Sequence, residues 1–322
     1  MSEKPTLVFV PGAWHKPQCY DKIIKILQDK HNIKCLSVTL PSTMNNPNAT
    51  FKDDVDAARQ IITAETTSGR DVIVISHSYG GIIGSSSIKG LTRNQKSATA
   101  SSSEHGYVKA QILIASGFAI TGLALMDPLF GIPPPFWRIN KETGYAEFVQ
   151  NPRDFLYHDV PQDEADYWVS QLMTQSLKAL FEGGEFAYDG WKGIPNWYIG
   201  TSEDKALPVV MQRVGVGMAR AQGGVVYHTE LQASHSPFLS MPDEVVAIIM
   251  QAVAKVTGDP AESVRAIGKV GKIETPAVRL FIPSTWFRFG IPLFIGRLFG
   301  WGFSGYYGLK KLWRGNDLKK KA

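Results

Sequence analysis

The stretch VIVISHSYGG, residues 72–81, decides the fold. Its first four residues are apolar and β-branched, which predicts a short strand buried on both faces of a sheet. Gly80 and Gly81 then mark a tight turn into a helix, so a serine stands at the apex. A nucleophile elbow has this geometry, and it needs small residues two positions before and two positions after the serine. Ser76 and Gly80 meet that spacing around Ser78, although glycine is the usual first residue.

Strand-like and helix-like runs alternate on both sides of this stretch. We expect strands over residues 6–15, 33–41, 109–117, 194–201 and 224–231, and helices over residues 20–30, 51–65, 80–88 and 242–256. Such alternation predicts an α/β fold whose mostly parallel sheet is flanked by helices on right-handed crossovers.

Two segments interrupt the alternation. Residues 90–107 are a polar run rich in serine and threonine, which we interpret as a flexible surface insertion. Residues 118–193 contain a proline-stiffened loop at 131–137 and a helical pattern over 163–181. A mostly helical insertion after a sheet strand is expected to form a cap over the carboxyl ends of the strands, where open α/β sheets bind ligands.

Composition narrows the class of protein. Only two cysteines occur, and the first residues lack a basic start followed by an apolar core, so we expect a reducing, cytoplasmic setting without a disulfide framework or a cysteine-rich metal site. Residues 277–322 carry a net charge of +8, whereas residues 1–276 carry −3. A nucleic-acid-binding protein would spread basic residues over its folded surface, and the body of this chain does not.

A serine nucleophile needs a histidine base and an acid that orients the base. His235 follows the last expected strand, in a loop where its imidazole can lean over the sheet. Glu203 and Asp204 come directly after the strand at 194–201, which suits the chain order serine, acid, histidine. Either carboxylate would satisfy that order.

The reaction also needs two backbone N–H groups to bind the oxyanion. Tyr79 follows the nucleophile and supplies one, and Ala13, in the loop after the first strand, supplies the other because Gly12 lets the backbone turn. We expect the apolar side chains beside these motifs to line a small substrate pocket: Trp14, Tyr79, Trp137 and Phe238.

The assembled motifs are similar to those of the α/β-hydrolase superfamily, in the branch that holds plant methylesterases, hydroxynitrile lyases and esterase-like bacterial and fungal proteins. The resemblance rests on VFVPGAWHKPQCYDKI, VISHSYGGI, DVPQDEADYWVSQLMTQS, YIGTSEDKALP and ASHSPFLSMPDEV, and it covers most of residues 5–256. It implies Ser78 as nucleophile, His235 as base and then acid, Asp204 as the orienting acid, and Ala13 and Tyr79 as oxyanion donors. It also implies that neither a metal nor an organic cofactor is needed.

Departures from the branch favour one reaction. The lyases carry threonine at the place of Gly12 and lysine after the histidine, where this chain has Ser236, so the resemblance implies hydrolysis of an ester, lactone or thioester of a small apolar or aromatic metabolite. Two alternatives stay open. One is a ligand-binding or receptor protein on a hydrolase scaffold, and the other is a biosynthetic acyltransferase or C–C bond hydrolase.

Residues 257–322 form an extension beyond the expected hydrolase domain of residues 1–256. Residues 277–322 hold 11 of the 35 aromatic residues, and the longest uncharged run, 298–309, is shorter than the ~20 residues that span a bilayer. Aromatic residues interleaved with arginine and lysine are typical of a segment lying on an anionic membrane surface. The terminal KKKA resembles a retrieval signal of the endoplasmic reticulum, so we expect a peripheral position on that internal membrane and a tail that the chemistry does not require.

Overall fold

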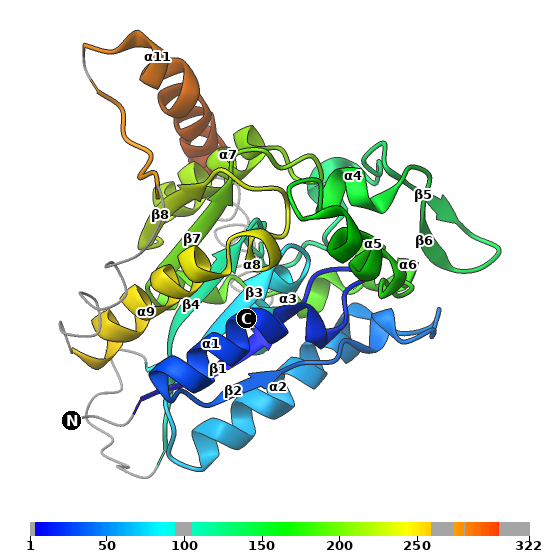
Figure 1. Cartoon of the computed structure of the whole chain (residues 1–322), viewed down its shortest axis with the longest axis horizontal. Coiled ribbons are helices and arrows are strands. Elements are labelled where there is room, and N and C mark those ends of the chain that lie inside the picture. The colour runs from blue at the N-terminus through cyan, green and yellow to red at the C-terminus, as the bar shows by residue number, and fades with distance from the viewer. Residues whose placement is uncertain (1–3, 94–104, 259–272, 280, 303–322) are drawn as a thin grey trace, which may run out of the picture.

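A computed structural model describes residues 4–93, 105–258, 273–279 and 281–302. Most of the polar insertion at 90–107 and the terminal KKKA lie outside these residues. The centre is a six-stranded parallel sheet in the order β2-β1-β3-β4-β7-β8 (Figure 1). Its strands are β1 (Thr6–Val10), β2 (Cys35–Ser37), β3 (Val72–His77), β4 (Val108–Ile114), β7 (Asn196–Thr201) and β8 (Val226–Leu231). The parallel sheet predicted from the alternation is confirmed, and all its strands end at one edge.

Alternate strand residues face opposite sides of the sheet, and each side builds its own core. Val72 and Val74 of β3 belong to one apolar cluster, whereas Ile73 and Ile75 belong to the other. The first face is covered by α2 (Phe51–Thr67), α3 (Gly80–Ser87) and α7 (Val209–Ala221), and the second by α1 (Asp21–His31) and α9 (Pro242–Thr257). Short turns complete these layers: η1 (Pro17–Tyr20), η2 (Pro41–Thr43) and α8 (Pro237–Ser240).

The insertion between β4 and β7 mixes helices with a small sheet. Its elements are η4 (Asp127–Leu129), β5 (Trp137–Asn140), β6 (Tyr145–Phe148), α4 (Pro152–Leu156), α5 (Gln162–Ser170), α6 (Leu177–Phe181), η5 (Gly184–Phe186) and η6 (Gly190–Gly193). The antiparallel β5–β6 hairpin lies at the far right of Figure 1. The mostly helical character expected here is therefore only partly right.

The single helix expected over residues 163–181 is wrong, because the chain leaves the helix after Ser170 and resumes it at Leu177. Between them the backbone bonds to the body of the protein. Met173 N donates to Trp14 O at 2.8 Å, and Ser176 N donates to Ser42 O at 2.9 Å. These contacts take the hydrogen-bonding groups that a continuous helix would have used internally.

The C-terminal segment, residues 273–302, packs on the β8 side of the sheet. Glu274 exchanges two backbone hydrogen bonds with Glu230 of β8, at 2.7 and 3.0 Å. Helical structure then runs over residues 283–302, beginning with α11 (Pro283–Thr285) and the π-helical turn η7 (Trp286–Gly290); we call residues 283–302 the C-terminal helix. No helix among the described residues is both long and apolar enough to cross a membrane.

Glycines bring the C-terminal helix close to α7. A Cβ on Gly217 would lie 2.2 Å from Leu293 O, and one on Gly296 would lie 2.0 Å from Val214 O. Phe289 is buried beside this contact. The described part of the extension is thus packed against the hydrolase domain, which weighs against the expectation that removing it leaves the domain undisturbed.

Candidate active site

Ser78 lies at the turn between β3 and α3, with its backbone held at φ +52°. A non-glycine residue in this left-handed region is strained, and such strain is a mark of a nucleophile elbow. The close packing is visible at Gly80, where a Cβ would lie 2.3 Å from Pro11 O. The unusual Ser76 fits because it faces Gly84, whose added Cβ would lie 2.3 Å from Ser76 Oγ. A glycine in the helix thus supplies the space that the usual glycine in the strand would leave.

His235 and Asp204, from the loops after β8 and β7, form a buried pair. His235 Nδ1 lies 2.7 Å from Asp204 Oδ2, and both residues are under one-tenth exposed. The carboxylate has further donors: Thr201 Oγ1 at 2.8 Å and Gln212 Nε2 at 3.0 Å on Oδ2, and the backbone N–H groups of Ala206 and Leu207 on Oδ1. These four donors hold the carboxylate of Asp204 against the imidazole of His235. Glu203, the other candidate acid, instead accepts from Gln232 near the surface.

The loop after β1 lies against Ser78. A Cβ on Gly12 would stand 2.8 Å from His77 Nδ1 and 3.2 Å from Ser78 Cβ, so a glycine lets the loop approach the serine closely. Ala13 and Tyr79 are both buried, and the backbone N–H of neither donates a hydrogen bond to another described residue. Trp14, the next residue, has a left-handed backbone at φ +61°.

Two of the expected pocket aromatics meet, and one lies elsewhere. The rings of Trp14 and Trp137 stand 6.0 Å apart edge to face, and Trp14 Nε1 donates to Ala146 O of the hairpin at 3.1 Å. Phe238 was wrongly placed with them. Its ring is fully buried on the opposite face of the sheet, against Tyr20, because α8 directs it away from the site. Sequence reasoning missed Phe136 and Phe148, which pack on Trp14.

The family model described as "Alpha/beta hydrolase family" matches residues 7–248. The chain belongs to the alpha/beta hydrolase family. An alpha/beta hydrolase of Aspergillus novofumigatus is 30% identical over 255 residues, covering 78% of this chain and 98% of the relative. A pyrethroid hydrolase of Sphingobium wenxiniae is 23% identical, covering 82% of this chain and 92% of the relative.

Solved structures of alpha/beta hydrolases share the fold. Polyneuridine aldehyde esterase matches with a TM-score of 0.59 at 16% identity, over 79% of this chain and 100% of the other. A methylesterase from Arabidopsis matches with a TM-score of 0.55 at 18% identity, over 78% and 99%. The resemblance inferred from the motifs is confirmed, as is the predicted fold class.

His77 is a residue of this hydrolase site that sequence reasoning left without a role. Its side chain points into the second core, where its ring stands 4.9 Å from that of Phe238. There His77 Nε2 lies 2.9 Å from the carbonyl oxygen of His235, so that nitrogen carries the proton and donates it. Burial holds the pKa of His77 well below its usual value and keeps the ring neutral. His77 therefore ties the loop that carries His235 to the strand that precedes Ser78.

His15, in the loop after β1, is also structural. Its Nδ1 lies 2.7 Å from Ala13 O and its Nε2 lies 2.8 Å from the hydroxyl of Tyr157, and the ring is buried. Burial lowers its pKa to about 4. Both ring nitrogens are occupied, so the imidazole supports the loop that carries Ala13.

The side chain of Tyr79 reaches a second buried carboxylate, Asp54 of α2. The Tyr79 hydroxyl donates to Asp54 Oδ2 at 2.8 Å, and Ser42 donates to Asp54 through both its N–H and its hydroxyl. No basic side chain among the described residues pairs with Asp54. Burial raises the pKa of Asp54 to about 6, and the three hydrogen bonds oppose that rise. Sequence reasoning missed this residue.

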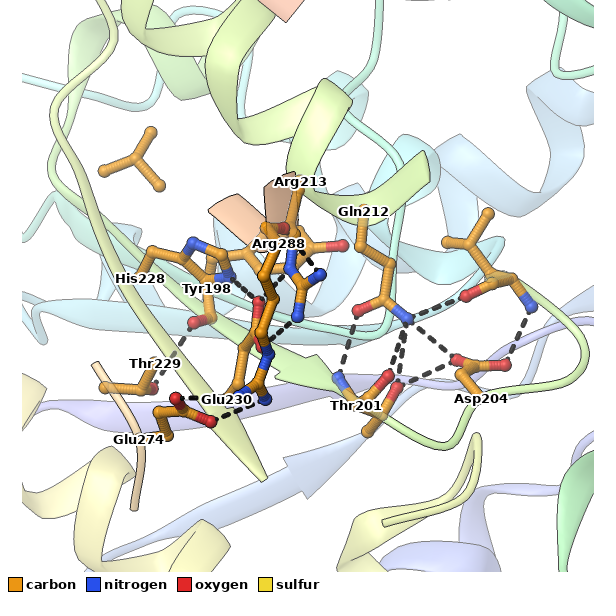
Figure 2. A network of polar contacts seen from close by, with 12 residues as sticks. Tyr198, Thr201, Asp204, Gln212, Arg213, His228, Thr229, Glu230, Glu274 and Arg288 are labelled. Atoms are coloured by element: carbon orange, nitrogen blue, oxygen red, sulfur yellow. Dashed lines mark hydrogen bonds and ion pairs between the residues drawn. The ribbon is translucent and has the colours of Figure 1, made fainter. Parts of the chain in front are cut away.

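A network of polar contacts also backs the Asp204 side (Figure 2). Gln212 of α7 donates to Asp204, and the next residue, Arg213, forms a two-bond ion pair with Glu230 at 2.8 and 2.7 Å, both side chains being buried. Arg213 Nη1 also donates to Arg288 O of the C-terminal helix at 2.8 Å. Two adjacent residues of α7 thus have different partners: Gln212 bonds to Asp204, and Arg213 bonds to the C-terminal helix.

Proposed function

We propose that this chain is a serine hydrolase that cleaves an ester, lactone or thioester of a small apolar or aromatic metabolite. The observation that carries the proposal is the buried His235–Asp204 pair, at 2.7 Å, on the same edge of the sheet as a serine held at φ +52°. Family membership supports hydrolysis, and the relatives named as esterases or as a pyrethroid hydrolase support an ester bond as the target.

In the proposed reaction His235 Nε2 takes the proton of Ser78 Oγ while that oxygen attacks the substrate carbonyl carbon. The N–H groups of Ala13 and Tyr79 stabilise the oxyanion, each contributing about 3 kcal/mol to the transition state. The tetrahedral species collapses, His235 gives its proton to the leaving alcohol or thiol, and an acyl group remains on Ser78. Water then attacks that acyl group by the same proton transfers, releasing the acid and free serine.

The aromatic cluster supports the substrate class. Trp14, Phe136, Trp137 and Phe148 gather where the insertion meets the loop after β1. Their rings are apolar and rigid, which suits a small apolar or aromatic substrate group better than a charged one. We propose that the insertion acts as the cap of this site.

The test is active-site labelling with a fluorophosphonate probe, together with turnover of p-nitrophenyl butyrate. We expect the wild-type protein to be labelled and to turn over, and Ser78→Ala to lose both. Ser76→Ala is the matched control: it removes a neighbouring hydroxyl that forms no hydrogen bond among the described residues, and it should keep both.

The outcome separates the alternatives. Labelling of Ser78→Ala, or no labelling of the folded wild type, would overturn the assignment. Labelling with tight ligand retention but a single turnover would identify a binding protein. Ester products formed with an added alcohol would identify an acyltransferase.

A further inference from the structure

The outer side of the C-terminal helix is rich in exposed apolar side chains. Phe287 is 72% exposed and Phe299 is 56% exposed, and both belong to what we call the aromatic face: Phe287, Ile291, Phe294, Ile295, Leu298, Phe299 and Trp301. Soluble monomers rarely leave such a patch uncovered, so large exposed patches mark interaction sites. The helix stands on the α7 side of the molecule, away from the β5–β6 hairpin (Figure 1).

The packing of the helix fixes which side faces outward. Its inner side consists of Phe289, Leu293, Gly296 and Gly300, and the glycines lie almost on the backbone of α7. A Cβ on Gly300 would stand 2.8 Å from Ala221 Cβ. Since these four residues face α7, the residues of the aromatic face point away from it. The exposure of the aromatic face therefore follows from the way in which the helix docks.

The charged residues of the C-terminal segment are almost all basic. Between Glu274 and Asp317 the sequence contains basic residues and no acidic ones. Arg297 lies among the exposed aromatics with its guanidinium 5.7 Å over the ring of Trp301, and it pairs with no carboxylate among the described residues. Arg288 is the exception, since it pairs with Glu274 at 2.7 Å.

We infer that the aromatic face docks on the surface of an anionic bilayer. Aromatic side chains with interleaved arginines settle at the boundary between headgroups and acyl chains, and anionic lipids attract the basic residues. A second copy of this chain is the rival occupant. A two-fold pairing would bring two segments of +8 together, so the charge favours lipid over self-association.

The experiment is sedimentation of the full chain with vesicles of phosphatidylcholine alone or with about 30% phosphatidylserine. We expect binding to the anionic vesicles to be at least about tenfold stronger, and to weaken severalfold in about 0.5 M salt. Phe294→Ser/Phe299→Ser should lower binding at least about tenfold, and Arg297→Gln should lower it about fivefold.

A matched control is Phe130→Ser/Ile132→Ser, which removes two comparably exposed apolar side chains from the insertion. It should bind like the wild type, and ester turnover should be unchanged in the aromatic-face variant and in Arg297→Gln. Equal binding to both vesicle types, or equal loss in the control, would overturn the proposal. So would a stable dimer in sedimentation velocity that Phe294→Ser/Phe299→Ser dissociates, because a second copy would then occupy the face.

Discussion

Asp204 and Asp54 are buried carboxylates on opposite flanks of the candidate site, and the protein surrounds them differently. Asp204 accepts from two backbone N–H groups, a hydroxyl, an amide and an imidazole. Among the described residues, the side chain of Asp54 accepts hydrogen bonds only from Ser42 and from the hydroxyl of Tyr79, and its pKa is raised to about 6 by burial.

The two residues show two ways in which a protein accommodates a buried carboxyl group. The flank of Asp204, which we call the acid flank, stabilises the negative charge of the carboxylate by many hydrogen-bond donors. Next to Gln212, one of those donors, Arg213 forms its buried ion pair with Glu230. The flank of Asp54 and Tyr79, which we call the oxyanion flank after the donor proposed at Tyr79, lacks a compensating cation among the described residues. The carboxyl group of Asp54 is therefore largely protonated, and so uncharged, in mildly acidic solution. We expect the acid flank to serve the reaction and the oxyanion flank to make the fold sensitive to pH.

The largest expected effect tests the acid flank directly. Asp204→Asn should lower kcat by about 10³–10⁴-fold, because an amide cannot hold the imidazole in the tautomer that accepts the serine proton. Steady-state turnover of p-nitrophenyl butyrate measures the change. Glu203→Gln, one residue away and near the surface, is the control and should stay close to wild type. A small loss in Asp204→Asn would mean that another acid orients His235.

The second-largest expected effect concerns stability and the Arg213–Glu230 ion pair. Arg213→Met should lower the free energy of unfolding by about 3–5 kcal/mol, because Glu230 would be left buried without its cation. Urea denaturation measures the change. Arg213→Met/Glu230→Leu should recover much of the loss, since it removes both charges. If the single variant costs under about 1 kcal/mol, the pair is not the support that its burial indicates.

The oxyanion flank predicts a pH effect of intermediate size. The native pKa of Asp54 is above its usual value, so between about pH 4 and pH 6 the native state binds more protons than the unfolded state. Stability from this group is therefore present at low pH and is lost as pH rises through 6. Relative to Asp54→Asn, the wild type should gain about 2 kcal/mol between about pH 7.5 and pH 4.5.

Urea denaturation of both proteins at the two pH values measures that difference, and contributions from buried histidines cancel because both proteins share them. An unchanged difference would show that Asp54 is ionised throughout the range.

The smallest effect comes from one hydroxyl. Tyr79→Phe should lower stability by about 1 kcal/mol at neutral pH, because Asp54 loses a donor. The loss should shrink at about pH 4.5, where the carboxyl group is protonated and needs the donor less. Turnover should change little, because the variant keeps the backbone N–H proposed for the oxyanion. A large fall in kcat would instead give the hydroxyl a role in chemistry.

Short-range patterns were enough to nominate the candidate residues. Ser78, His235 and Asp204 were predicted because each follows a strand and parallel strands end at one edge, and the structure pairs His235 with Asp204. Asp54 could not be found in this way, because within α2 it looks like a solvated acid beside Lys52 and Asp53. Its burial depends on Tyr79, 25 residues further along the chain.

Other errors have equally local causes. Phe238 is close to His235 in sequence, but the turn of α8 sends it to the opposite face of the sheet. The β5–β6 hairpin did leave a signal, since its strands flank a turn that ends in Gly144 at φ +75°. The helix α7 was not anticipated because Gly215 and Gly217 are poor helix formers. Gly217 is needed because the C-terminal helix packs so closely on it that a Cβ would not fit.

The backbone bridge between Glu230 and Glu274 has a consequence for the order in which the protein is made. All the proposed catalytic residues leave the ribosome before the segment that covers the outer edge of β8. At ordinary rates of translation the remaining residues take several seconds, during which β8 is an uncovered edge and Arg213 lacks one acceptor. A nascent chain halted after α9 would therefore hold all the residues proposed for the reaction while still exposing β8, an edge strand with which another sheet could pair.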